Sequence, residues 1–144
     1  MDNLRINLPA ACKSGCLLAA ALVFASITGI SHAAPLLTCK VSYAGTTHTV
    51  QTRPVSDPYL VESVDIGGRF RFKAVMVGTP SRVDYVSLYA YLETRTQPLL
   101  VQQSKYLPPF RRSTKPYPLT GQQFVYAGPV ERELMYSCTL EGTP

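Results

Sequence analysis

The sequence predicts an all-β domain, either an antiparallel β-sandwich of immunoglobulin-like form or a small barrel, closed by one disulfide. Apolar and polar residues alternate over short stretches, Gly and Pro recur between these stretches, and no segment has a sustained helical period. Two cysteines, Cys39 and Cys138, lie near the two ends of the segment expected to fold. Because the chain contains no Trp, the buried Trp of antibody domains is absent.

Residues 1–33 have the pattern of a signal peptide. Arg5 and Lys13 precede the apolar run "CLLAAALVFASITGI", and "SHAAP" follows with the small residues that a signal peptidase recognises. We expect cleavage after Ala33 and a single exported β domain over residues 34–144, in the periplasm or outside the cell. The apolar run is shorter than the roughly 20 residues of a spanning helix, so no permanent membrane span is expected after cleavage.

The charge of the exported part argues against nucleic acid as a partner. Cleavage would leave 111 of the 144 residues, with 12 basic and 8 acidic side chains and a net charge of +4. This excess is mild, and the sequence signatures of RNA-binding modules are absent.

The two cysteines that survive cleavage are expected to pair. Cys12 and Cys16 lie in the signal peptide, so Cys39 and Cys138 remain. The alternation in "LTCKVSY" and "VERELMYSCTLE" directs both sulfurs toward the core. Reactive or metal-binding thiols are the alternative, although there is no C-x-x-C pair and no neighbouring His.

Turn residues divide the exported chain into candidate strands. Gly45, the segment 54–58, Gly67 with Gly68, "GTPS", Pro98 and "AGP" are the main breaks. The predicted strands span residues 36–43, 46–52, 59–66, 69–77, 83–93, 98–104, 121–127 and 130–141.

A basic stripe with tyrosines beside it is the first candidate binding surface. A hairpin around a five-residue loop, residues 78–82, would place Val77 opposite Val83 and Arg71 opposite Tyr89. Phe and aliphatic residues then share the core face, and the open face carries the candidate binding residues Arg69, Arg71, Lys73, Tyr85, Tyr89 and Tyr91. Tyr and Arg are common in protein interfaces, and both are also ordinary on a solvated sheet face, so both interpretations stay open.

A proline-rich basic run is the second candidate surface. The segment "LPPFRRSTKPYPL", residues 107–119, lies in an interval without acidic residues, 94–130, and cannot be a central strand because proline lacks the amide donor. We expect a long surface loop with the candidate binding residues Arg111, Arg112 and Lys115, close enough to the stripe to extend it. A plain connection is the alternative.

Catalytic and metal motifs are not evident. His48 stands alone in the exported part, and no G-x-S-x-G motif is present. Asp57, Glu62 and Asp65 are interpreted as loop, strand and turn residues rather than as a catalytic pair. No metal or cofactor is therefore expected.

Three strings, "DIGGRFRFKAV", "KYLPPF" and "YAGPVERELMYSC", resemble those of small exported proteins of Gram-negative bacteria that carry no assigned activity. The resemblance implies export and no mechanism. We predict an envelope or periplasmic binding module without catalysis, whose partner is an envelope protein or an anionic envelope polymer. A small inhibitor of an envelope-active hydrolase and an enzyme with an unrecognised site are the alternatives.

Overall fold

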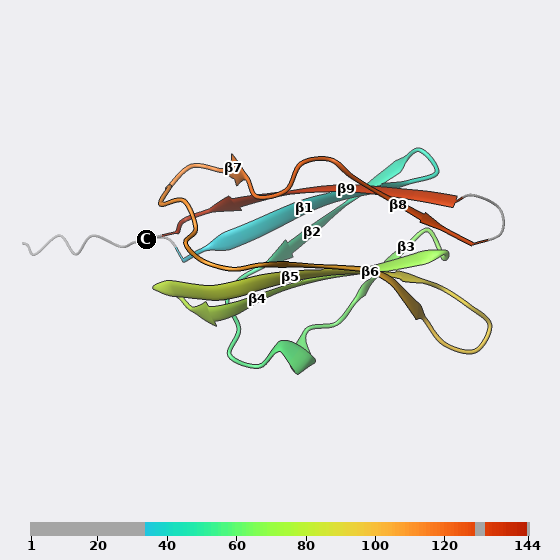
Figure 1. The fold of residues 1–144 in the computed structure, drawn as a ribbon, viewed down its shortest axis with the longest axis horizontal. Helices are drawn as coiled ribbons and strands as arrows, with labels where there is room; N and C mark the ends of the chain where they lie inside the picture. The colour runs from blue at the N-terminus through green and yellow to red at the C-terminus, as the bar shows by residue number, and fades with distance from the viewer. Residues whose placement is uncertain (1–33, 129–131, 144) are drawn as a thin grey trace, which may run out of the picture. The chain divides into compact units, whose positions relative to one another are not determined.

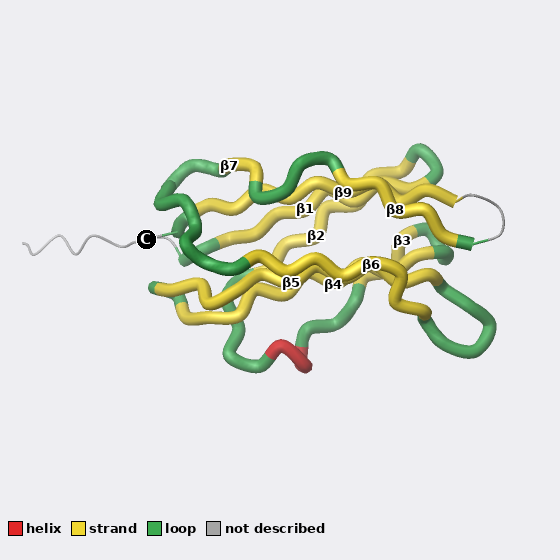
Figure 2. The backbone as a smooth tube through the Cα atoms, viewed as in Figure 1, coloured by secondary structure: helices red, strands yellow, loops and turns green. Residues whose placement is uncertain are grey.

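Two antiparallel sheets stack face to face and form a β-sandwich, as Figures 1 and 2 show. The computed structural model describes residues 34–128 and 132–143, so the predicted signal peptide lies outside the described residues. One sheet has the order β2-β1-β9-β7, with β8 also paired to β9, and the other has the order β3-β4-β5-β6. We call them sheet A and sheet B. The predicted sandwich is confirmed.

The observed strands match the predicted ones to within two residues at each end, except for the predicted strand at residues 59–66, and the short strand β7 was not predicted. The predicted strands at residues 36–43 and 46–52 are confirmed, whereas the one at 59–66 is mostly wrong. Asp57 caps a short 3-10 helix there by accepting a hydrogen bond from the Tyr59 amide at 2.9 Å, and only the last residues of the segment form a strand. The elements are β1 (Leu36–Tyr43), β2 (Thr46–Thr52), η1 (Pro58–Leu60), β3 (Val64–Ile66), β4 (Phe70–Thr79), β5 (Arg82–Leu92), β6 (Leu99–Tyr106), β7 (Tyr117–Pro118), β8 (Gln123–Ala127) and β9 (Arg132–Glu141).

The disulfide lies inside sheet A. Cys39 of β1 and Cys138 of β9 are direct cross-strand partners, bonded to each other and buried. The alternation around both cysteines therefore points inward as predicted. In antibody domains the disulfide joins the two sheets, and the strand order is also different, so the likeness to immunoglobulin domains extends to the two-layer architecture and no further.

Aromatic side chains join the two sheets across the core. Phe72 of β4 packs on Tyr136 of β9 with ring centroids 5.0 Å apart, and Phe70 meets Tyr43 of β1 edge to face at 5.2 Å. Both phenylalanines are fully buried, as predicted, because alternate residues of β4 face sheet A. These contacts hold the layers together and leave the other face of β4 directed outward.

The predicted register of the β4–β5 hairpin is wrong by two residues. Arg71 lies opposite Tyr91, not Tyr89, and the loop is tighter than the predicted five residues because pairing continues to Thr79 and Arg82. A bulge at Val77 and Gly78 accommodates this closure. Because the shift is an even number of residues, the predicted core face and open face keep their members.

Two long connections pass between the sheets. The segment between β2 and β3 first bridges β4, where the Val55 amide donates to the Met76 carbonyl at 2.9 Å and the Gly78 amide donates to the Val55 carbonyl at 3.1 Å. It then carries η1 outside sheet B, on the side away from sheet A (Figure 1). The segment between β6 and β7 is the proline-rich basic run.

Candidate binding surfaces

The first candidate surface lies on the outer side of sheet B and comprises Arg71, Lys73, Tyr89 and Tyr91. We call it the tyrosine face. Cross-strand pairing joins Arg71 to Tyr91 and Lys73 to Tyr89. The two tyrosine rings stack at 6.3 Å with an interplanar angle of 18°. Burial, followed by the neighbouring Tyr89, raises the pKa of Tyr91.

Carboxylates offset the positive charge of the tyrosine face. Arg71 Nε lies 3.3 Å from Glu93 Oε1. A groove of about 450 Å³ runs beside these residues, and Glu62 lines it together with Arg71 and Lys73. An anionic ligand would therefore meet one carboxylate already paired with the arginine and a second in the groove wall.

Arg69 and Tyr85 are less closely tied to this face than predicted. Arg69 is exposed and precedes β4, and its carbonyl accepts a hydrogen bond from the Glu93 amide at 2.8 Å. Tyr85 pairs with Val77 near the opposite end of the hairpin. The cation over its ring is Lys105 of β6, whose Nζ lies 4.1 Å from the ring centroid.

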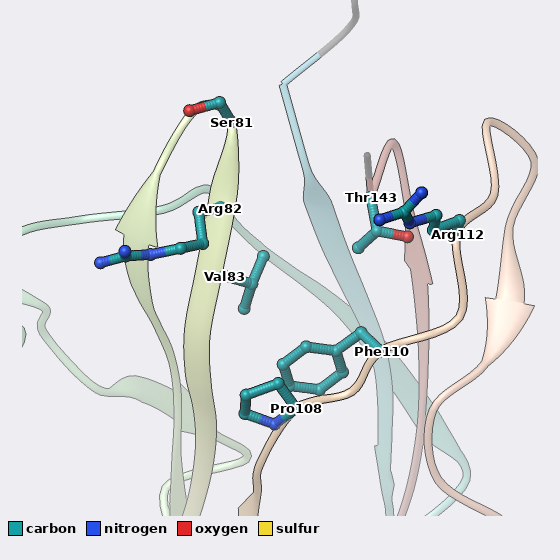
Figure 3. A pocket seen from close by; sticks show the side chains of 7 residues that line it. All are labelled: Ser81, Arg82, Val83, Pro108, Phe110, Arg112 and Thr143. Carbon is teal, nitrogen blue, oxygen red and sulfur yellow. The ribbon is translucent and has the colours of Figure 1, made fainter.

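The basic loop does not extend the tyrosine face, contrary to our expectation. Arg112 lies beside the β4–β5 turn and Thr143 (Figure 3), whereas Arg71 lies at the other end of β4. The reason is the anchoring of the loop to the C-terminal end of the chain. The Ser113 amide donates to the Thr143 carbonyl at 3.2 Å, and the Thr143 hydroxyl donates to the Arg111 carbonyl.

Two neighbouring clefts share Phe110 as a common wall. The end cleft, about 300 Å³, lies between Val83 on one side and Arg112 and Thr143 on the other, with Phe110 and Pro108 between them (Figure 3). Arg82 also borders this cleft, but its side chain points away from it (Figure 3) and forms an ion pair with Asp84 at 2.7 Å. Arg112 is therefore the cation available at the end cleft.

The second cleft, which we call the side groove, measures about 370 Å³ and lies where β6 ends and β7 begins. Lys105 and Arg111 are its basic lining residues, with the Lys105 Nζ itself over the Tyr85 ring, and Tyr106, Phe110 and Tyr117 supply aromatic surface. Leucines and prolines complete the lining, and none of the described residues that line the end cleft or the side groove carries a carboxylate.

Tyr117 gives the side groove a buried polar atom. The guanidinium carbon of Arg111 lies 5.7 Å from the Tyr117 ring centroid. Tyr117 is only 9% exposed, and its hydroxyl has no hydrogen-bond partner among the described residues. A buried hydroxyl without a partner is uncommon in folded proteins. The Tyr117 hydroxyl therefore gives the aromatic wall of the side groove a polar atom that a ligand could bind.

Lys115 is exposed on the same loop, outside both clefts. Its amide donates to Ser113 Oγ at 3.1 Å, and its carbonyl accepts from that hydroxyl at 2.7 Å. The predicted binding residues thus separate into the tyrosine face, the Tyr85–Lys105 contact and the basic loop. Sequence reasoning overlooked Lys105, Phe110 and Tyr117, for which aromatic residues between prolines in a basic run were the available signal.

Two of the three acidic residues considered for catalysis, Asp57 and Asp65, stabilise turns, and the third, Glu62, lines the groove beside the tyrosine face. Asp57 accepts from the Tyr59 amide, and Asp65 accepts from the Gly68 amide at 2.9 Å. Among residues 34–128 and 132–143, no three His, Cys, Asp or Glu side chains gather as metal ligands. Within the same ranges, no helix has the length and apolar character needed to cross a membrane.

Comparison with known proteins gives no relative. The chain matches no protein-family model, and no curated protein or solved structure is significantly similar to it.

Proposed function

We propose that this protein is an exported binding module of the cell envelope, without catalytic activity, that holds an acidic protein segment in the end cleft and side groove. The observation that carries the proposal is that three basic residues, Lys105, Arg111 and Arg112, belong to the linings on either side of Phe110, while none of the described lining residues carries a carboxylate. Cations in such positions form charge-assisted hydrogen bonds with carboxylates, and their field also speeds association.

The apolar lining favours a protein segment over a purely anionic polymer. Aromatic rings and leucines beside the cations bury apolar side chains, which peptides supply and strongly charged polymers lack. Tyr and Arg at the centre of such a surface are the residue types that contribute most to protein binding.

The basic loop is also ordered before binding. Its hydrogen bonds to Thr143 fix the backbone at Arg111 and Ser113. A preformed surface loses less conformational entropy on binding than a flexible one, so fewer contacts suffice for useful affinity.

Capture from cell-envelope extract tests the proposal against the tyrosine face. The mature protein, residues 34–144, is compared with a cleft variant (Lys105→Ser, Arg111→Ser, Arg112→Ser) and a face variant (Arg69→Ser, Arg71→Ser, Lys73→Ser). Each variant removes three positive charges. We expect the cleft variant to lose capture of acidic proteins and the face variant to retain it, with capture by the parent weakening as salt increases.

The reverse result would move binding to the tyrosine face. Equal capture by all three proteins across the salt series would mean that both basic surfaces are only solvated.

A further inference from the structure

The segment that carries η1 projects an apolar tip into solvent. Tyr59 is 90% exposed and Leu60 is 79% exposed, and both lie on the outer side of sheet B (Figure 1). Two large apolar side chains side by side and almost fully exposed are unusual on a protein that remains free in solution, and such a tip is typical of an interaction element.

The tip is held in one conformation from both sides. The hydrogen bonds of Val55 to β4 fix its start, and β3 pairs with β4 after it. Within the tip, the Asp57 side chain accepts a hydrogen bond from the Tyr59 amide and so caps η1, and Pro58 is the first residue of that helix. A tip fixed in this way is prepared for insertion into a cavity.

Acidic residues flank the tip. Asp57 lies two residues before Tyr59, and Glu62 lies two residues after Leu60. Anionic membrane surfaces repel such a segment, which argues for a protein cavity with a basic rim. The side groove of this same chain has that character, because Lys105 and Arg111 border rings and leucines in a space of about 370 Å³.

We propose that the tip, Asp57–Glu62, inserts into the side groove of a second copy of this protein, with Tyr59 and Leu60 against its rings and the two carboxylates beside Lys105 and Arg111. This rests on the proposed function and names the acidic segment that the groove holds. The tip projects from the outer side of sheet B (Figure 1), whereas the side groove lies between the end of β6 and β7, so the contact forms between copies.

The geometry makes this contact head to tail. Each copy has one tip and one groove on different parts of its surface, so association either closes, as a reciprocal dimer or a ring, or continues into an open chain.

Complementary variants test the inference by sedimentation velocity. The tip variant (Tyr59→Ser, Leu60→Ser) keeps an intact groove, and the groove variant (Lys105→Glu, Arg111→Glu) keeps an intact tip. We expect the parent to associate in a way that depends on concentration and salt. Each variant alone should associate at least about tenfold more weakly than the parent. Their equimolar mixture should form a dimer that does not grow.

Phe124→Ser is the matched control, because Phe124 is an exposed aromatic residue, 55% accessible, on β8 of sheet A. It should associate like the parent. Thermal melts of all variants confirm that each is folded before association is compared.

A parent that stays monomeric up to about 1 mM, or folded variants whose mixture stays monomeric, would overturn self-docking. Capture from envelope extract separates the two proposals. A monomeric parent that still captures acidic proteins through the cleft residues contradicts self-docking alone, whereas capture that is insensitive to those residues contradicts the proposed function.

Discussion

Cys39 and Cys138 face each other on adjacent strands of sheet A, with Cα atoms 4.0 Å apart and a separation of 99 residues along the sequence. The bond therefore closes almost the whole described domain into one loop. On a chain-entropy estimate, replacing both cysteines with Ala should lower the free energy of unfolding by about 4–5 kcal/mol, measured by urea unfolding of residues 34–144. A thiol reagent that labels either cysteine in the folded, unreduced protein would show that the bond is absent.

Phe72→Ala should lower the free energy of unfolding by about 3–5 kcal/mol, because the ring is fully buried and packs on Tyr136 between the sheets. Phe124→Ala, which shortens an exposed ring, should change it by less than about 1 kcal/mol. Urea unfolding measures both. Equal losses would contradict the assignment of Phe72 to the core.

Gly78→Ala should destabilise the β4–β5 hairpin by about 1–3 kcal/mol, measured by urea unfolding. Gly78 has φ +153°, and a Cβ there would collide with the Arg82 carbonyl oxygen, so the bulge would have to open. Gly121→Ala is the control, since the space that its Cβ would occupy is free of other side chains and backbone to a distance of 4 Å. A neutral Gly78 variant would mean that the bulge is not needed for closure.

The folded protein should lose stability as the pH rises above about 10, the usual pKa of tyrosine. Burial, and then the neighbouring Tyr106, raises the pKa of Tyr136 despite the opposing effect of the Ser104 hydroxyl. The unfolded chain therefore releases this proton first, and the free energy of unfolding falls between the unfolded and folded pKa values. Urea unfolding of the parent and of Tyr136→Phe across this range should show a shallower fall in the variant. Identical slopes would contradict the raised pKa.

The core face of the domain could be predicted from alternation, because burial of every second residue depends on local sequence. Phe70 and Phe72 are buried as predicted even though the hairpin register is shifted. A shift of two residues changes the cross-strand neighbours and keeps every side chain on its face. Alternation therefore predicted the four residues of the tyrosine face, but it did not predict which of them pair or that Arg69 and Tyr85 lie apart from them.

The candidate clefts could not be predicted in the same way. Arg111 and Arg112 are far along the chain from Thr143, and it is the pairing of Ser113 with Thr143 that sets their position. The distance between the basic loop and Arg71 depends on the course of the chain between sheets, which no periodicity reports. The exposed tip was hidden for a related reason, since Tyr59 and Leu60 have the composition of a strand and are lifted out of the sheet by the capped turn at Asp57.

The last strand in the sequence occupies an inner position in sheet A, where β9 pairs with β1 on one side and with β7 and β8 on the other. A chain delivered with its N-terminus first therefore cannot complete this sheet until residues 132–141 have emerged. Until then the β1–β2 hairpin has an unpaired edge, and contacts between such distant segments form slowly. Interrupted synthesis should consequently yield fragments that pair with other chains and aggregate.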